Sequence, residues 1–429
     1  MKPPQWSRRQ LLAAGGAAGA AALLGSLRPG ERGSPHDGYF RQLSAALRAA
    51  GIATPTLVLD RERLRANVGQ VLRNLNGRIP LRLVVKSLPC PALLREAAAL
   101  AGTRRHMLFS LPQLLAMAEG DHDILLGKPL PAAAALAFYR GFPPGAFQPE
   151  RQLQWLVDTP QRLAQYRELA RAQRLRLRVN FEIDVGLHRG GIAGGDEMRA
   201  MLDILRSEPR LQWAGLMGYD AHVAKLPDLP GLRARAHAHA RQAYAGFAEQ
   251  IKAWPGLMAG SGSPCFNAGG SPTYRLYDGS GVENEVALGS ALVKPGDFDS
   301  ALLADLLPAC FIAAPVLKAL PRFQLPYGVE WLGGLLRAWD VNARRAYFLY
   351  GGNWLADPVS PPGLAGSALY GASSNQQVLL GSGRQALKVD DTVFFRPRQS
   401  EAVLQQFGAI AVYQDGRIVE MWQPFLATA

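Results

Sequence analysis

One lysine lies where a buried strand is expected to end. In the segment Leu81-Arg-Leu-Val-Val-Lys-Ser-Leu-Pro-Cys90, residues 81–85 have the apolar, β-branched composition of a short buried strand, and Lys86 follows it. A lysine there is expected to be partly desolvated, which favours its neutral, nucleophilic amine. Such an amine can form a Schiff base with a carbonyl compound. The alternative is a side chain that only extends into solvent.

Three further segments place polar groups directly after expected strands. They are Glu182-Ile-Asp-Val-Gly-Leu-His-Arg-Gly-Gly191, Gly218-Tyr-Asp-Ala-His222 and Gly269-Gly-Ser-Pro-Thr-Tyr274. In a barrel, the residues that follow the strands share one mouth. The backbone N–H groups and hydroxyls of the third segment could bind a phosphate, although ordinary turns use the same residues. A lysine, a guanidinium, a tyrosine, a histidine and a phosphate loop on one rim would make a catalytic site.

The elements that must position these groups alternate regularly. Helical patterns separate eight short apolar segments, and prolines stand at or near the first turn of several of these helices. This alternation predicts an α/β protein with a (β/α)8 barrel. An open doubly wound sheet is the competing fold, but no strand is followed by a GxGxxG turn. The expected strands are 81–86, 107–110, 124–127, 153–158, 175–186, 213–221, 265–268 and 286–292.

The pattern changes near residue 300. Beyond it, strand signals dominate, helical periodicity is scarce, and Asp415-Gly416 predicts the turn of a hairpin within 408–422. We therefore expect a barrel over residues 31–300 and a C-terminal β-rich domain over residues 301–429.

Residues 1–30 have the features of an export signal. Ser7-Arg-Arg-Gln-Leu-Leu12 precedes a weakly hydrophobic run, and the paired arginines resemble the twin-arginine signal, whose pathway carries folded proteins. We expect an exported, periplasmic protein. The run is too short for a stable membrane span, and an uncleaved N-terminal anchor is the alternative.

Composition restricts the partners. The chain has 429 residues and a net charge of +13, with 48% hydrophobic and 19% charged residues, which is typical of a globular protein. Its arginines are dispersed on helix faces and not interleaved with aromatic residues, so no nucleic-acid partner is expected. The three cysteines, Cys90, Cys265 and Cys310, form no CxxC pair, which argues against a disulfide framework or a structural zinc site.

Five segments, in this order, resemble the D-threonine aldolase and D-serine dehydratase group. They are Thr54-Pro-Thr, Val85-Lys-Ser and the three polar segments described above. Members of this group are pyridoxal phosphate enzymes of fold type III, related to alanine racemase. The resemblance runs from Thr54 to the C-terminus and is greatest with the amino acid deaminase/aldolase branch, which has a motif similar to Phe395-Arg-Pro-Arg-Gln-Ser-Glu401. It implies a barrel of the alanine racemase type.

The resemblance also implies residue roles. Lys86 would hold pyridoxal 5'-phosphate as a Schiff base, and Arg189 would contact the phenolic oxygen of the cofactor. Tyr219 and His222 would lie near the ring and the substrate, with His222 as the candidate base. The alternatives are that Arg189 pairs with nearby carboxylates, Glu182 or Asp184, and that His222 is structural. The implied phosphate-binding residues are Gly269, Gly270, Ser271 and Thr273.

The chain departs from the group at its metal site. Metal-dependent members place a His-x-Cys or His-x-Asp pair in the C-terminal domain, where this chain has Gln399-Ser-Glu401. All seven histidines lie at or before His239. We therefore expect no bound metal of that kind.

The expected function is that of a pyridoxal phosphate-dependent lyase, similar to an aldolase or dehydratase, acting on a D- or β-hydroxy amino acid through Lys86. The alternatives are an amino acid racemase, for which a second base cannot be identified, and a catalytically inactive cofactor- or amino-acid-binding protein. By analogy the resemblance implies a homodimer.

Overall fold

The computed structural model describes residues 28–143, 145–227, 229–254, 256 and 263–426. The expected export signal lies outside these residues, except for its last three. The chain forms two compact units. One unit comprises 56–311 together with 396–426, and the other comprises 28–55 together with 312–395. The first is called the barrel unit below, and the second the β unit.

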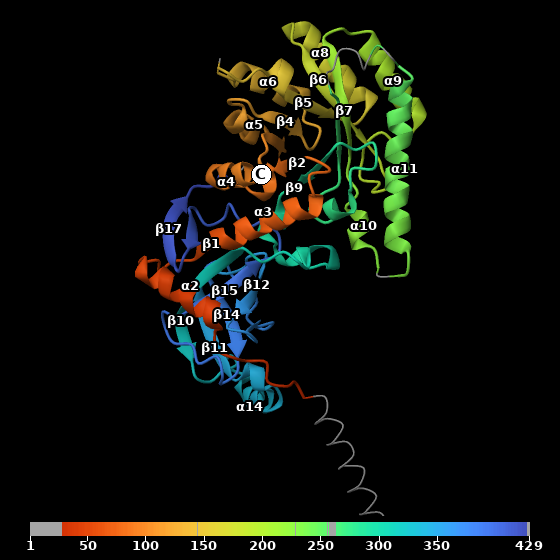
Figure 1. Ribbon diagram of the computed structural model, residues 1–429. Helices are drawn as coiled ribbons and strands as arrows, with labels where there is room; N and C mark the ends of the chain where they lie inside the picture. The colour runs from red at the N-terminus through yellow and green to blue at the C-terminus, as the bar shows by residue number, and fades with distance from the viewer. Residues whose placement is uncertain (1–27, 144, 228, 255, 257–262, 427–429) are drawn as a thin grey trace, which may run out of the picture. The chain divides into compact units, whose positions relative to one another are not determined.

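The barrel unit contains a closed barrel of eight parallel strands (Figure 1). Every strand expected from the sequence is present, and the predicted (β/α)8 barrel is confirmed. Strand β9 pairs with β2 through Leu81 and Val286, which closes the ring. The strands are β2 (Leu81–Val84), β3 (Arg105–Leu108), β4 (Asp123–Leu126), β5 (Leu153–Val157), β6 (Leu177–Ile183), β7 (Leu211–Gly218), β8 (Cys265–Ala268) and β9 (Glu285–Leu288).

Local sequence signals start and stop the helices around the barrel. Ser110 and Thr159 are N-caps whose hydroxyls accept backbone N–H groups, and a proline follows in the first turn of each helix. Gly102 ends α4 in the left-handed conformation. The helices of the unit are α3 (Arg61–Leu75), α4 (Pro91–Ala101), α5 (Leu111–Met117), α6 (Ala132–Gly141), α7 (Pro149–Gln152), α8 (Pro160–Gln173), α9 (Gly195–Arg206), α10 (His222–Lys225), α11 (Leu232–Lys252) and α13 (Ser290–Val293).

A buried ion pair lies inside the barrel. The Arg82 guanidinium on β2 is fully buried, and its Nε donates to Glu285 Oε1 of β9 at 2.5 Å. Glu285 Oε1 also accepts from the Asn267 amide of β8 at 2.8 Å. Burial raises the pKa of Glu285, but Arg82 and the hydrogen bonds more than offset this and leave it below its ordinary value. A charged pair therefore links three neighbouring strands.

The C-terminal segment belongs to the barrel unit, which differs from the predicted boundary at residue 300. Strand β1 (Thr56–Asp60) pairs in parallel with β16 (Ile410–Gln414), which pairs antiparallel with β17 (Arg417–Trp422). The hairpin turns at Asp415-Gly416 as predicted, with positive φ at both residues. The backbone pairing of β1 with β16 brings the end of the chain to the barrel unit, and the sequence contains no local signal for such a long-range contact.

The β unit is built on antiparallel pairing. Its strands follow the order β13-β14-β11-β10, and β15 joins β10 to β12. Phe323, Ala346 and Val378 form a small core. The sequence does not predict α14 (Glu330–Trp339). The elements are α2 (Gly38–Ala49), β10 (Cys310–Leu320), α14, β11 (Arg345–Tyr350), β12 (Ala356–Ser360), β13 (Ala365–Gly366), β14 (Gln376–Gly381) and β15 (Thr392–Pro397), with β10 and β15 ending across the unit boundary.

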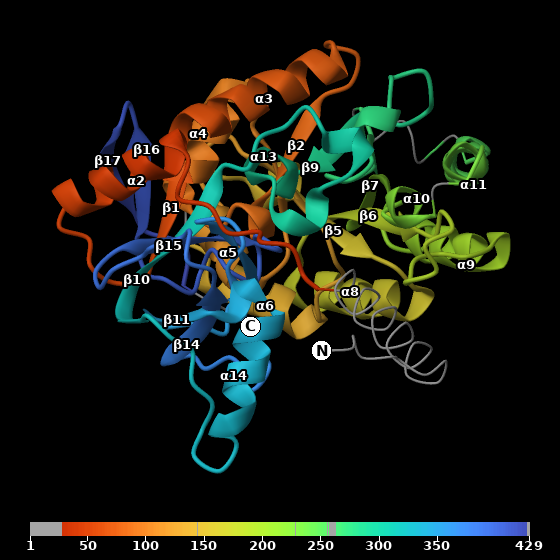
Figure 2. The same ribbon diagram turned by 90° about the horizontal axis from the view of Figure 1, so that it is seen from below.

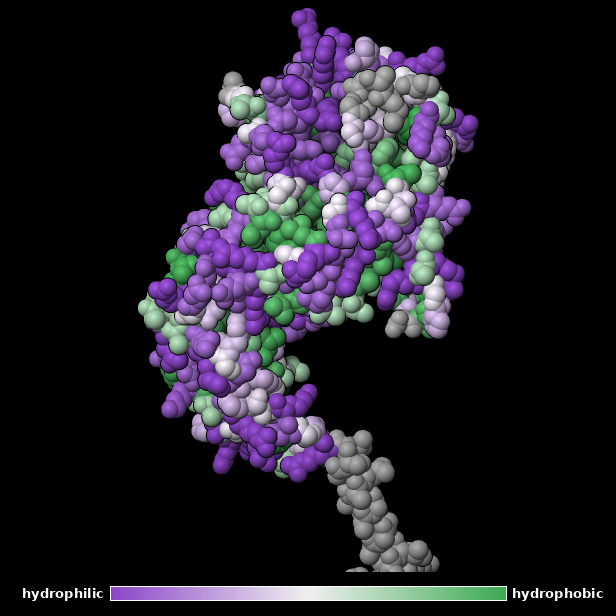
Figure 3. All heavy atoms as spheres, in the orientation of Figure 1, coloured by the Kyte–Doolittle hydropathy of each residue, from purple (hydrophilic) through white to green (hydrophobic). Residues whose placement is uncertain are grey.

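Hydrophilic side chains dominate the surface around α6, α8 and α11 on the face shown in Figure 3. This agrees with a charge that is spread over a solvated surface. Within the part of the chain that the structure describes, no helix is both long enough and apolar enough to cross a bilayer.

Candidate active site

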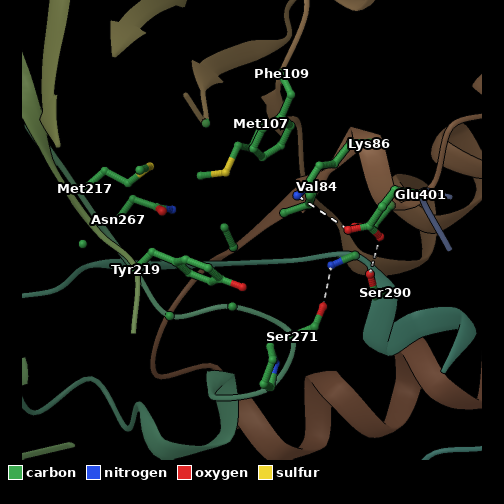
Figure 4. A pocket seen from close by; sticks show the side chains of 18 of the residues that line it. Val84, Lys86, Met107, Phe109, Met217, Tyr219, Asn267, Ser271, Ser290 and Glu401 are labelled. Atoms are coloured by element: carbon green, nitrogen blue, oxygen red, sulfur yellow. Dashed lines mark hydrogen bonds and ion pairs between the residues drawn. The ribbon is translucent and has the colours of Figure 1, made fainter. Parts of the chain in front are cut away.

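A pocket opens at the carboxyl ends of the barrel strands (Figure 4). The loops after β2, β3, β4, β6, β7, β8 and β9 line it, together with a residue of the C-terminal segment. This is the end at which barrel enzymes hold their catalytic groups. The lining residues include Lys86, Phe109, Arg189, Tyr219, Asn267, Gly269, Gly270, Ser271, Ser290 and Glu401.

Lys86 points into this pocket from the short 3-10 helix, Val85–Ser87, that follows β2. Its side chain is 42% exposed, so the amine is less desolvated than the sequence predicts. Its Nζ lies 3.6 Å from Glu401 Oε1 and 4.7 Å from the centroid of the Phe109 ring. A carboxylate and an aromatic face therefore orient the amine toward the pocket.

Glu401 lines the pocket, although the sequence singles it out only at the place where metal-dependent relatives have a His-x-Cys or His-x-Asp pair. Its Oε1 faces Lys86, and its Oε2 accepts hydrogen bonds from Ser400 Oγ at 3.2 Å and Ser290 Oγ at 3.5 Å. Figure 4 shows Glu401 and Lys86 pointing toward each other. The carboxylate is thus held in place on one side and open to the pocket on the other.

The glycine-rich loop after β8 forms another wall. Gly269 has a φ of +65°, which favours glycine, and a Cβ on Gly270 would lie 2.5 Å from Tyr219 Cε2. The Ser271 hydroxyl accepts from the backbone N–H groups of Gly289 and Ala291, each at 3.1 Å. With its lone pairs engaged, this hydroxyl can donate its proton to an acceptor in the pocket.

Thr273 does not line the pocket, although the sequence assigned it to phosphate binding. It is fully buried, and its hydroxyl accepts from Gly270 N at 3.2 Å and donates to Asp220 Oδ1 at 2.6 Å. Asp220 also accepts from Tyr277 Oη at 2.9 Å. Burial raises the pKa of Asp220 above its ordinary value, against the hydrogen bonds from Thr273 and Tyr277. Thr273 therefore stabilises the conformation of the glycine-rich loop by linking Gly270 to Asp220.

Tyr219 and Arg189 stack at the pocket. The Arg189 guanidinium carbon lies 4.9 Å from the centroid of the Tyr219 ring. Burial raises the pKa of Tyr219, and Arg189 acts in the opposite direction. Because this pKa lies above its ordinary value, the phenol stays protonated near neutral pH and can donate a hydrogen bond.

One of the two alternative partners of Arg189, Asp184, is engaged elsewhere, and the other, Glu182, interacts with Arg189 only at longer range. Asp184 accepts from the ring of His188 at 2.7 Å and from the backbone N–H groups of Gly186 and His188. In the described chain, no carboxylate oxygen lies within salt-bridge distance of Arg189. The guanidinium is therefore available to a ligand in the pocket.

His222 begins α10 and does not line the pocket. Its Nδ1 is buried and lacks a hydrogen-bond partner, and its Nε2 lies close to Gly186. The sequence correctly places this residue just after β7, but its ring packs near Gly186 and is not among the side chains that line the pocket. The structure therefore does not support His222 as the base that acts in this pocket.

Among the described residues, no group of three or more His, Cys, Asp or Glu side chains is arranged to hold a metal ion. The β unit does contain one histidine, His36, because residues 28–55 fold with it. Its Nδ1 lies 2.8 Å from Ser360 Oγ. The β unit therefore contains an imidazole, even though the chain has no histidine beyond residue 239.

The family model described as alanine racemase, N-terminal domain, matches residues 59–295, which is over half of the chain. The chain belongs to this family, whose enzymes use pyridoxal phosphate.

Individual relatives agree with this class. Over 253 residues the chain is 26% identical to D-threonine aldolase of an Arthrobacter species, covering 58% of this chain and 63% of that protein, so it spans less than two thirds of the relative's length. The structure of D-threonine aldolase from Filomicrobium marinum is similar at a TM-score of 0.68 and 18% identity, covering 86% and 94% of the two chains. The structure of D-threo-3-hydroxyaspartate dehydratase from Delftia sp. HT23 is similar at a TM-score of 0.65 and 18% identity. The match covers 87% of this chain and 98% of that one.

The residues present fit pyridoxal phosphate. An amine that can bond to an aldehyde, Lys86, faces the pocket. Gly270 has no room for a side chain beside Tyr219, and the Ser271 hydroxyl is prepared to donate to a phosphate. Lys86, Arg189, Tyr219, Gly269, Gly270 and Ser271 would hold the cofactor, which supplies an electron sink for bonds to the substrate Cα.

Proposed function

We propose that this chain is a pyridoxal phosphate-dependent lyase acting on a D- or β-hydroxy amino acid. The observation that carries the proposal is the pairing of Lys86 Nζ with Glu401 Oε1 at 3.6 Å across one pocket. The lysine binds the cofactor, and a separate carboxylate remains to move a proton of the substrate. The similarity to D-threonine aldolase and D-threo-3-hydroxyaspartate dehydratase supports this reaction class.

Glu401 takes the role of the base in this proposal. In an aldolase reaction, its carboxylate accepts the proton of the β-hydroxyl as the Cα–Cβ bond breaks, which releases the aldehyde. Return of a proton to Cα then gives glycine. Ser290 and Ser400 hold the other carboxylate oxygen and so fix its orientation. The Tyr219 phenol, with its raised pKa, serves as a hydrogen-bond donor.

The first test separates cofactor binding from proton transfer. Lys86→Ala should remove the visible absorbance of the bound cofactor and the label left by borohydride reduction. Glu401→Gln should keep that absorbance but lower turnover of a β-hydroxy amino acid by about 100-fold or more. Glu249→Gln, an exposed substitution on α11, is the matched control. Full turnover in Glu401→Gln would exclude this carboxylate as the base.

A product analysis then distinguishes the reaction types. D- and L-amino acids with and without a β-hydroxyl are incubated with the enzyme, and the products are separated by chiral chromatography. Aldehyde with glycine indicates an aldolase, and a keto acid with ammonia indicates a dehydratase. An inverted amino acid would indicate a racemase, and no product would indicate a binding protein. Either of the last two results contradicts the proposal.

A further inference from the structure

Helix α14 of the β unit turns its apolar face outward. Trp331 is 71% exposed and Leu335 is 63% exposed, and Trp339 lies on the same side at helical spacing. The only buried residue of the helix is Gly333, while Arg337 donates to the carbonyl of Phe323. A helix that packs on a core normally buries its apolar face. This one presents that face to the surroundings.

The apolar surface continues beyond the helix. A groove beside it is lined by leucines, by Trp339 and by Arg28, and the preceding loop carries Tyr327, which is 97% exposed. Figure 2 shows α14 and this loop extending beyond β11 and β14 of the same unit. Contiguous exposed apolar patches of this kind mark interaction surfaces. The leucines are Leu325, Leu332, Leu335 and Leu336.

The chain enters the unit at this groove. Arg28, the first described residue, donates from Nε to the carbonyl of Trp339 at 3.0 Å. The residues immediately before it in the sequence include Leu23, Leu24 and Leu27, the end of the weakly hydrophobic N-terminal run. That run is therefore covalently joined to the chain at the edge of the groove.

Positive charge flanks the patch. Arg28, Arg322 and Arg344 are exposed, and the backbone N–H of Phe323 bonds to the carbonyl of Arg344, which places the last two close together. Arginine beside tryptophan and leucine is typical of helices that lie in the interface of an anionic bilayer. Tryptophan is enriched at the level of the lipid headgroups because its ring is amphipathic.

We propose that α14 and the loop 325–329 form a surface that binds anionic phospholipid bilayers. The apolar side chains enter the headgroup region, and the arginines contact lipid phosphates. A second copy of this chain is the competing occupant. A two-fold contact centred on the patch would set the flanking arginines against their own copies, which disfavours that arrangement. Contact of the patch with another face of a second copy is an outcome that the test below distinguishes. This inference is independent of the proposed chemistry.

Flotation of the full chain with vesicles tests the proposal. Wild-type protein should float with vesicles that contain phosphatidylglycerol, and less with phosphatidylcholine alone. Trp331→Glu/Leu335→Glu should lower the partition coefficient by about tenfold or more, because two apolar contacts are lost and like charge is added. Val389→Glu, an exposed apolar site elsewhere in the β unit, is the matched control. Undiminished flotation of the double variant would overturn the proposal.

A second measurement locates the contact, since the N-terminal run could itself bind lipid. Leu335→Cys in the full chain is labelled with an environment-sensitive fluorophore, with Val389→Cys as the control; the three native cysteines are buried. A blue shift at position 335 alone, on adding the anionic vesicles, supports the proposal. No shift would overturn it, as would concentration-dependent self-association that the Trp331→Glu/Leu335→Glu variant abolishes.

Discussion

Glu182 is a half-buried acid near the carboxyl end of β6, at the mouth of the barrel. Its pKa is raised to about 7, chiefly by burial and then by Asp158, while Arg189 acts in the opposite direction. Since its ordinary value is 4.5, the folded state keeps a proton that the unfolded state has released over the interval between these pKa values. The free energy of unfolding therefore falls as pH rises from about 4.5 to about 7.

This pH dependence can be measured. Glu182→Gln resembles the protonated acid, so it should remove up to ~3 kcal/mol of the stability loss between about pH 5 and pH 8. Urea unfolding of wild type and variant at both pH values gives the comparison. Glu150→Gln, on α7, is a control at a surface site. An identical pH dependence in wild type and Glu182→Gln would show that this carboxyl does not keep its proton.

At the scale of single residues, the sequence predicts which residues follow the barrel strands better than it predicts which of their side chains line the pocket. Lys86 and the loop at Gly269 were predicted because each follows a strand within a recognisable motif. His222 also follows a strand, but it begins α10 and does not line the pocket. Glu401 reaches Lys86 only because the segment after residue 395 returns to the barrel unit. Neither of these placements has a local sequence signal.

The buried pair of Arg82 and Glu285 joins strands β2 and β9 of the barrel. Replacing Arg82 with Met would leave the Glu285 carboxylate buried without its counter-charge, which is expected to cost about 3–5 kcal/mol. Arg82→Met/Glu285→Leu should recover much of this loss, because no unpaired charge remains. Urea unfolding of both variants provides the measurement. A loss of less than about 1 kcal/mol in the single variant would mean that water or the neighbouring arginine, Arg105, compensates the carboxylate.

At the scale of elements, the barrel was predictable and α14 was not. The eight strands are short apolar runs between helices with proline and capping signals, so each could be found locally. Helix α14 contains Gly333-Gly334 and turns its apolar face outward, which obscures the usual pattern. Unit boundaries depend on the pairing of β1 with β16, a contact between distant parts of the chain.

For the whole molecule, the placement of the potential metal-binding side chains predicts catalysis without a tightly bound divalent metal. A catalytic site usually needs about three protein ligands, and the described residues bring no such group together. Dialysis against a chelator should leave the rate unchanged within about twofold. Loss of activity with recovery on manganese, zinc or magnesium would contradict this expectation and make Glu401 the first ligand to mutate.

A second prediction for the entire chain concerns its export. We expect the folded protein to cross the inner membrane through the twin-arginine route, because Arg8-Arg9 precedes a weakly hydrophobic run. Arg8→Lys/Arg9→Lys should retain a fused reporter in the cytoplasm, as fractionation would show. Arg28→Lys, outside the paired arginines, is the control. Unchanged export of the double variant would indicate another route.

The order in which the chain is synthesised gives the position of Glu401 a further consequence. The ribosome completes the eight barrel strands and then all of 312–395 before it adds the segment that carries this carboxylate. A nascent chain can therefore present Lys86 and the glycine loop while its site still lacks the acid that faces the lysine. Under the proposed role of Glu401, a product truncated before residue 396 would retain all eight barrel strands and still lack the base.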